Sequence, residues 1–380
     1  MTDKNDTKPL KTEALLDRAG RQAWTNRFTL EGIAAALFDD RDDALSELER
    51  SLMDNALRSL VRNVETRILN QIAQRKDTPK EFTKLLAWDV AASHDDGDGY
   101  AYPILEKSGV LRATALIEVI KHRMQIHRLT LILRRLNRES SIASLMEDQQ
   151  SSIIQSLLVA PPPESVDRLK SFIDAETERM DTFQYPLIRP VDLPPAVIKQ
   201  LCWWIAAALR DYAITLSLMD RETFDGCFEK ATKAVIEQLH DESSPVNEAG
   251  EVIEILASSG RFSIELLLQL LRQGEVTLFE AGFAKLTGLR GTLVSRLLYE
   301  TGGESLAVAC KAVGIEPADF AMLYGYTRHG RLTADAARNG NQDIIEFYDA
   351  IEKPAAEAVL ERWRCDPDFL YAIKLLEQAE

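Results

Sequence analysis

The residues whose types best suit chemistry are two histidines, His122 and His127, which stand among arginines and lysines. A histidine that accepts phosphate must be exposed on a helix with basic neighbours, so phosphotransfer through either side chain is one hypothesis. Their spacing of five residues places the two rings on different faces of a helix, which argues against a shared metal ion.

The rest of the chain offers little further material for catalysis. It has 5 histidines in 380 residues, and it lacks the glycine-rich phosphate loops, the zinc-peptidase helix motif and the nucleophile elbow. The cysteines are far apart and form no C-x-x-C pair, so we expect reduced thiols rather than a zinc or redox site. They are Cys202, Cys227, Cys310 and Cys365. We therefore expect a protein that is not an enzyme and that has no cofactor and no bound metal.

The stretch around the two histidines is unusually basic for a chain whose formal net charge is −15. It contains no acidic residue from 121 to 138, and positions 121, 128 and 135 would share one face of a continuous helix. This pattern predicts a docking surface for an acidic partner or for anionic lipid. The alternative is a solvated face that pairs with acidic neighbours. The predicted partner-binding residues are Lys121, Arg123, Arg128, Arg134, Arg135 and Arg138.

Two stretches, residues 284–297 and 309–320, have the spacing of a helix-turn-helix DNA reader. This spacing is also what a tight turn between any two helices needs. The second predicted recognition helix opens with Glu316 and carries Asp319, which DNA phosphates repel. DNA binding is therefore a third hypothesis, and we do not expect a nucleic-acid partner.

The acidic stretch at residues 94–99 resembles a calcium loop at first sight. An EF-hand loop needs oxygen ligands at alternating positions. Counting from Asp95 places Gly97 and Gly99 at two of these positions, so ligand carboxylates are missing. We expect a solvated acidic loop.

Helices must position all of these residues, because apolar residues recur three and four apart along most of the chain. The low counts of glycine (18) and proline (14) also favour long helices. Helix starts are predicted at Thr29, at Ser263 and at residues 78–81, and no run of alternating residues predicts a strand. Glycines predicted to end helices are Gly109, Gly260, Gly288 and Gly314. The predicted fold class is all-α.

An internal similarity predicts how the helices are arranged. Residues 104–109 and 255–260 share the pattern Ile-Leu-x-x-Ser-Gly ahead of an apolar helix. We expect stacked antiparallel helical hairpins in a HEAT-like, solenoid-type curved body, although unrelated hairpins also share such caps. The triple proline at 161–163 predicts a boundary. The expected regions are a loose polar N-terminus (1–25), an N-terminal helical-repeat region (26–160) and a C-terminal helical region (164–380) with the Trp203/Trp204 helix and a terminal helix ending near Glu377.

The termini and the most apolar segment predict a cytoplasmic protein. The first residues, MTDKNDTKPLKTE, lack the apolar core of a signal peptide. The most apolar window, residues 201–209, is too short to span a bilayer. We therefore expect no membrane span.

Several stretches, taken in their order along the chain, resemble the alphaproteobacterial domain-of-unknown-function 2336 family. They are YPILEKSGVL at 102–111, the His127 helix ending in Arg134 and Arg135, PLIRP at 186–190 through LPP at 193–195 to Trp203 and Trp204, LRQGE at 271–275 before Leu278 and Phe279, and Trp363-Arg364 near Pro367 and Leu370. The resemblance covers roughly residues 30–375 and implies a helical, HEAT-like bacterial cytoplasmic protein, with no established activity and no catalytic residues to carry over. Two departures are the loop at 94–99 and Met124, where the family pattern leads us to expect a hairpin glycine.

The best functional prediction is a non-enzymatic adaptor or regulatory scaffold that binds another protein through its helical surface. The partner is expected to present an acidic surface, and a homodimer stays open. Histidine phosphotransfer through His122 or His127 is the alternative, and DNA binding is the third hypothesis.

Overall fold

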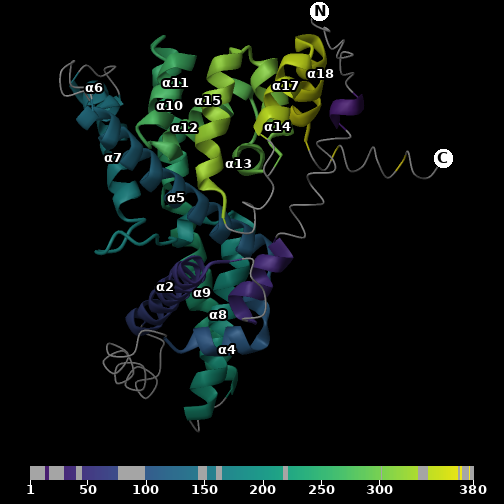
Figure 1. Cartoon of the computed structure of the whole chain (residues 1–380). Coiled ribbons are helices and arrows are strands. Elements are labelled where there is room, and N and C mark those ends of the chain that lie inside the picture. Colours follow the sequence, from purple (N-terminus) through teal and green to yellow (C-terminus); the bar gives the residue numbers. More distant parts are fainter. Residues whose placement is uncertain are drawn as a thin grey trace, which may run out of the picture. The chain divides into compact units, whose positions relative to one another are not determined.

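The computed structural model describes most of the chain as helices (Figure 1). The described residues are 13–16, 30–39, 45–75, 99–143, 152–159, 165–216, 221–300, 302–332 and 341–366, with 369 and 376. Within these ranges there is no β-strand, so the all-α prediction is confirmed. Residues Met180 and Pro186 form an isolated antiparallel bridge.

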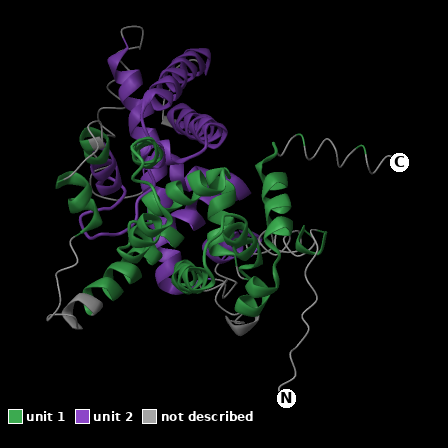
Figure 2. Ribbon diagram, turned by 90° about the horizontal axis from the view of Figure 1, so that it is seen from above, with its two compact units in different colours: residues 1–29, 125–170, 248–380 green, residues 30–124, 171–247 purple. Residues whose placement is uncertain are grey.

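The described helices group into two compact units that interleave along the chain (Figure 2). Unit 1 comprises the described parts of 1–29, 125–170 and 248–380, and unit 2 those of 30–124 and 171–247. The boundary predicted at 161–163 lies outside the described residues, as do most of the N-terminal 25 residues and most of the chain after 366. The predicted division into regions therefore stays a prediction.

Unit 2 is built around four helices that contact one another: α2 (Glu47–Gln74), α4 (Ala101–Ser108), α8 (Pro195–Leu216) and α9 (Arg221–Asp241). It also contains η1 (Val110–Arg112), η2 (Pro190–Asp192), the first part of α5 (Thr114–Ala143) and the last part of α7 (Ser165–Thr177). Apolar residues of α2 and α8, such as Leu60, Val64 and Leu201, are fully buried. Trp203 and Trp204 are both half-buried on α8.

A buried carboxylate fixes the start of α4. Glu65 of α2 accepts hydrogen bonds from the backbone N–H groups of Tyr100 (3.0 Å) and Ala101 (2.9 Å), which satisfies donors that the first turn of a helix leaves unpaired. Gly99 precedes this turn with φ +67°, and a Cβ atom there would lie 2.9 Å from Glu65 Oε2. Gly99 is thus the described end of the predicted acidic loop, and residues 94–98 lie outside the described residues.

Unit 1 carries the rest of α5 and α7, together with a series of shorter helices. They are α6 (Ile153–Val159), α10 (Pro245–Ser258, from residue 248), α11 (Ile264–Arg272), α12 (Val276–Thr287), α13 (Gly291–Tyr299), α14 (Glu304–Ala312), α15 (Pro317–Thr327), η3 (Arg328–Gly330), α17 (Asn341–Ala350) and α18 (Lys353–Arg364). Successive helices from α11 to α15 contact each other, as hairpins must, but α11 also contacts α15, and α14 contacts α17 and α18.

The helix ends follow the sequence signals. Gly109 and Gly260 both adopt the left-handed conformation, with φ values of +76° and +70°, which an L-residue with a side chain rarely adopts. Ser263 caps α11, because its side chain accepts a hydrogen bond from the backbone of Leu266 (3.2 Å). Helix α5 runs without a break through Met124, the position where the family pattern leads us to expect a hairpin glycine. The predicted caps at Thr29 and at 78–81 lie outside the described residues.

The four cysteines are all thiols. Cys202 and Cys310 are buried, whereas Cys365 is exposed and Cys227 is intermediate. Burial raises the pKa of the Cys202 thiol to about 12, so this side chain is protonated and behaves as a small apolar group.

Candidate functional site

Helix α5 carries all of the basic residues predicted to bind a partner, but it buries some of them and exposes others. Lys121 and Arg123 belong to the part of α5 in unit 2, and both are buried. In unit 1, Arg128 is half-buried, and the exposed basic residues near the end of the helix are Arg134, Arg135 and Arg138. The predicted set therefore includes both buried and exposed residues. Only its last three members have side chains that are exposed to solvent.

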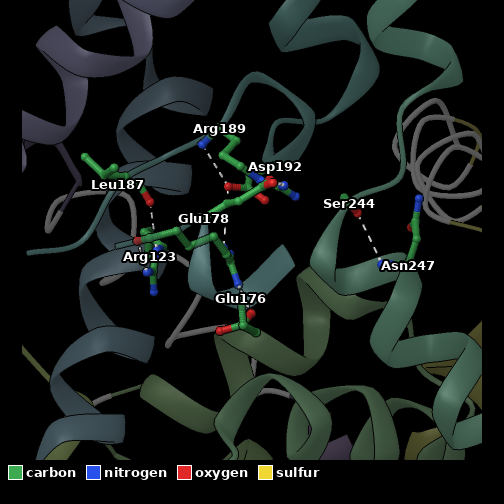
Figure 3. A network of polar contacts seen from close by, with 9 residues as sticks. Arg123, Glu176, Glu178, Leu187, Arg189, Asp192, Ser244 and Asn247 are labelled. Carbon is green, nitrogen blue, oxygen red and sulfur yellow. Dashed lines mark hydrogen bonds and ion pairs between the residues drawn. The ribbon is translucent and has the colours of Figure 1, made fainter. Parts of the chain in front are cut away.

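Arg123 lies in the interior of unit 2, where it holds the loop that follows α7 (Figure 3). Its side chain is 2% exposed; Nε donates to the carbonyl of Leu187 (3.0 Å) and Nη2 to that of Arg179 (2.6 Å). Burial lowers the pKa of Arg123, and the neighbouring charge of Arg179 lowers it further. Arg123, predicted to face a partner, instead donates to the backbone of its own unit.

Charges within the same network are matched (Figure 3). Arg179 Nη1 pairs with Glu176 (2.7 Å), and Arg179 Nε lies 3.4 Å from Asp192. Arg189 pairs with Glu178, and its backbone N–H donates to Asp192 Oδ2 (2.8 Å). With Arg123, three arginines face three carboxylates, so this network ties the segment between α7 and α8 together and leaves no net charge for a ligand.

The two candidate phosphoacceptors differ in exposure. His127 is 5% exposed, whereas His122 is half-buried. A phosphoryl donor must reach the imidazole nitrogen, so His122 is the better placed of the two. The phosphotransfer hypothesis stays a prediction.

The exposed end of α5 presents one continuous face, which we call the α5 face: Leu131, Arg134, Arg135 and Arg138. These positions follow the i, i+3, i+4, i+7 pattern of one side of a helix. Leu131 is 47% exposed and stands beside the three cations on this face. Arg134 Nη2 lies 3.3 Å from Glu275, and Arg135 Nε lies 2.9 Å from Glu139. Exposed pairs of this kind are worth about 0–1 kcal/mol, so a partner can displace them at little cost.

The turn between α11 and α12 fixes the α5 face in position. Gly274 has φ +78°, and a Cβ atom there would lie 2.8 Å from Arg134 Cγ and 3.1 Å from the carbonyl of Thr130. Glycine is therefore required both by the backbone conformation and by the close approach to α5. This contact places Glu275 beside Arg134.

A second group of basic side chains lies at and around η3, and the sequence analysis missed it. Arg328, His329 and Arg331 follow α15 directly, and Arg331 is buried while His329 is exposed. Burial lowers the pKa of His329, and the charges of Arg328 and Arg128 lower it further, so these groups lie close together. The signal available in the sequence was Arg-His-Gly-Arg, three basic residues in four positions directly after an apolar helix.

The two stretches with helix-turn-helix spacing do form helix pairs. Residues 284–297 cover the end of α12 and most of α13, and residues 309–320 cover the end of α14 and the start of α15. Phe320 of α15 is fully buried, and Lys285 of α12 pairs with Glu254 (2.7 Å). DNA binding through these pairs stays a prediction.

Two features of the described residues bear on metals and membranes. No group of three or more histidine, cysteine, aspartate or glutamate residues among them could hold a metal ion. Within the same part of the chain, no helix is both long enough and apolar enough to cross a bilayer.

The fold and the basic surfaces define an all-α protein with an arginine-rich helix face. The family model described as "Uncharacterised protein conserved in bacteria (DUF2336)" matches residues 101–361. The chain therefore belongs to the DUF2336 family, as its sequence patterns predict. None of the curated proteins and none of the solved structures matches it.

Proposed function

We propose that the protein is a non-enzymatic adaptor or regulatory scaffold of the bacterial cytoplasm that binds an acidic surface of another protein. The observation that carries this proposal is the α5 face, where Leu131 is exposed beside Arg134, Arg135 and Arg138. Arginine is enriched in protein interfaces, and three arginines around one apolar side chain suit a partner with a small apolar site and an acidic rim.

The two kinds of residue have different roles in this proposal. Leu131 supplies apolar area that leaves water on binding, worth roughly 1–2 kcal/mol for a half-exposed leucine. The arginines attract and orient the acidic partner, which raises the association rate more than the final affinity. Binding should therefore weaken as salt increases.

The HEAT-like arrangement is part of the same proposal. Contacts between successive helices from α11 to α15 support it, since stacked hairpins contact their neighbours in this way. Such an array would supply an extended surface beside the α5 face. A second copy of the chain is an alternative occupant of that face.

The test is capture of partners from a lysate of the source bacterium by the full chain, followed by affinity measurement with the purified partner. The variant Arg134→Glu/Arg135→Glu/Arg138→Glu should lose binding at least tenfold while keeping its helical circular dichroism. The matched control is Lys285→Glu/Lys353→Glu/Arg362→Glu, which reverses three exposed charges elsewhere in unit 1. Equal binding by both variants would remove the α5 face as the docking site.

Phosphotransfer is the competing function. His122 is the favoured acceptor, because it is half-buried whereas His127 is buried. Acid-labile phosphate on the wild type that disappears in His122→Gln, but not in His127→Gln, would favour this function over the adaptor. The adaptor proposal expects no such phosphate.

A further inference from the structure

Arg331 is a buried cation of unit 1, and two of its three nitrogen donors find no acceptor among the described residues. It is 4% exposed and directly follows η3. Its Nε and Nη2 atoms are buried, and neither reaches an acceptor among the described residues. Buried polar groups nearly always have a hydrogen-bond partner, and an unmatched buried charge is strongly unfavourable. An acceptor from outside the described residues is therefore expected.

The two unsatisfied atoms form a chemically specific pair. In a guanidinium group, Nε–H and one N–H of Nη2 point in the same direction along one edge. This edge binds two oxygens of a carboxylate or a phosphate in a bidentate manner. The unsatisfied donors of Arg331 are thus those that an oxyanion uses.

A tyrosine holds two of the guanidinium groups in place. The Cζ atom of Arg331 lies 5.4 Å, and that of Arg328 lies 5.7 Å, from the centre of the Tyr324 ring. The Tyr324 hydroxyl donates to the carbonyl of Gly302 (3.3 Å), and its ring lies so close to Gly303 that no Cβ atom would fit there. Both arginines are therefore positioned by a fixed aromatic ring.

The nearby carboxyl group of Glu300 offsets the charge of Arg331 only in part. Burial lowers the pKa of Arg331, whereas Tyr324 raises it through charge and a side-chain hydrogen bond. The charge of Arg328 lowers this pKa further, and that of Glu300 raises it. Glu300 already accepts a hydrogen bond from the backbone of Ser305 (2.7 Å) at the start of α14, and burial raises its pKa to about 7. Among the described residues it forms no ion pair with Arg331, so its carboxylate offsets the buried charge only in part.

Arg328 lies close to both Arg331 and His329, and Arg128 of α5 lies close to His329. The charge of Arg128 lowers the pKa of His329, and the charge of Arg328 lowers the pKa of both His329 and Arg331. Gly330 allows this approach, since a Cβ atom there would lie 2.7 Å from Tyr299 Cε1 and 3.2 Å from the carbonyl of Gln125 on α5. The exposed imidazole of His329 lies at the surface of this group. Four basic side chains in one place create a positive potential that favours a dianion over a monoanion.

We propose that Arg331, together with Arg328, Arg128 and His329, binds the phosphate group of a phosphate monoester. Arg331 is the bidentate anchor, and the other three side chains complete the charge around the tetrahedral dianion. The phosphate could belong to a small molecule or to a phosphorylated side chain. The site consists of residues outside the α5 face and does not rest on the proposed adaptor function.

The first test is binding of inorganic phosphate to the full chain, followed by ³¹P NMR line broadening and by thermal unfolding. Sodium chloride and sodium acetate at the same ionic strength are the comparison anions. Phosphate at a hundredfold excess over its Kd should raise the Tm by roughly 5–10 °C, and acetate should raise it much less. No shift with phosphate, or an equal shift with acetate, would overturn the proposal.

The variants locate the binding. Arg331→Gln should lose at least tenfold in phosphate affinity, and because it removes an unmatched buried charge it should fold without phosphate. Arg328→Gln, at a half-buried position, must also weaken binding, and this keeps the proposal testable if Arg331→Gln does not fold. Arg290→Gln is the matched exposed control and should bind as the wild type does. Unchanged phosphate binding by Arg328→Gln or Arg331→Gln would refute the site.

O-phosphoserine and glycerol phosphate then distinguish the source of the phosphate. Tighter binding of O-phosphoserine than of inorganic phosphate would support a phosphorylated side chain as the ligand. Tighter binding of glycerol phosphate would support a small-molecule ligand. Either result requires that Arg331→Gln abolish the gain.

Discussion

Replacing Arg123 tests whether the basic start of α5 stabilises the fold or binds a partner. Arg123→Ala removes two charge-assisted hydrogen bonds, each worth about 1.5–3 kcal/mol. The carbonyl of Arg179 keeps the bond that it accepts from the backbone of Leu187 (2.8 Å), so the Leu187 carbonyl is the acceptor that loses most. Removing the desolvated charge beside Arg179 offsets part of the loss. We expect a net destabilisation of roughly 2–4 kcal/mol.

The measurement is urea unfolding followed by circular dichroism, with hydrogen exchange over residues 178–193 as the local readout. Arg123→Lys keeps the charge but not the two-pronged donor geometry, and it should recover less than half of the loss. Arg135→Ala, which breaks only an exposed pair with Glu139, is the control and should leave the unfolding midpoint in urea unchanged. If Arg123→Ala matched this control, the network in Figure 3 would not stabilise the loop, and our assignment of Arg123 would be wrong.

The remaining predictions concern two buried carboxyl groups, Glu300 and Glu65. Burial raises the pKa of Glu300 from 4.5 to about 7. Between these pH values Glu300 is protonated in the native state but ionised in the unfolded chain. The free energy of unfolding therefore falls as pH rises from 4.5 to about 7, and Glu300 contributes no further pH dependence above that. Glu300→Gln should remove this pH dependence. Between pH 4 and pH 8, the difference in stability between the variant and the wild type should change by at most about 3 kcal/mol in thermal melts. Parallel plots of Tm against pH for the two proteins would contradict the raised pKa of Glu300. Glu65→Ala should destabilise unit 2 by about 1–3 kcal/mol through loss of the α4 cap. Gly99→Ala should also be destabilising, but less so in the Glu65→Ala background, where the contact between the new Cβ atom and the Glu65 carboxylate is gone. Additive losses of stability in this double-mutant cycle would show that the two residues do not interact.

Local signals in the sequence predicted the fold class and many helix ends. The apolar period gave helices throughout the described residues, and Gly109, Gly260 and Ser263 end or begin helices where their residue types indicate. These features depend on only a few neighbouring residues, which is why they can be read from the chain alone. Family membership followed in the same way from the order of short patterns.

The candidate sites could be predicted only in part, because they depend on contacts between distant segments. A basic run such as 121–138 shows which residues share a helix face, but it does not show which face another segment covers. The acceptor of Arg123 lies 64 residues further along the chain. The group around Arg331 likewise combines α5 with residues near 300 and 324, so no local pattern could assemble it. Met124, which departs from the glycine of the family pattern, lies inside the unbroken helix α5, as its residue type favours.

The interleaving of the two units constrains the order in which the chain can fold during synthesis. Unit 2 cannot be completed until α8 and α9 have left the ribosome, after the unit 1 part of α5 is already made. The turn at Gly274, which packs against Arg134, is translated on the order of 10 s after Arg134 itself. During that delay Thr130 and Arg134 of α5 lack the later turn at Gly274 that packs against them. The nascent protein is therefore expected to depend on chaperones at this stage, and truncations between 143 and 248 should aggregate rather than yield a folded half.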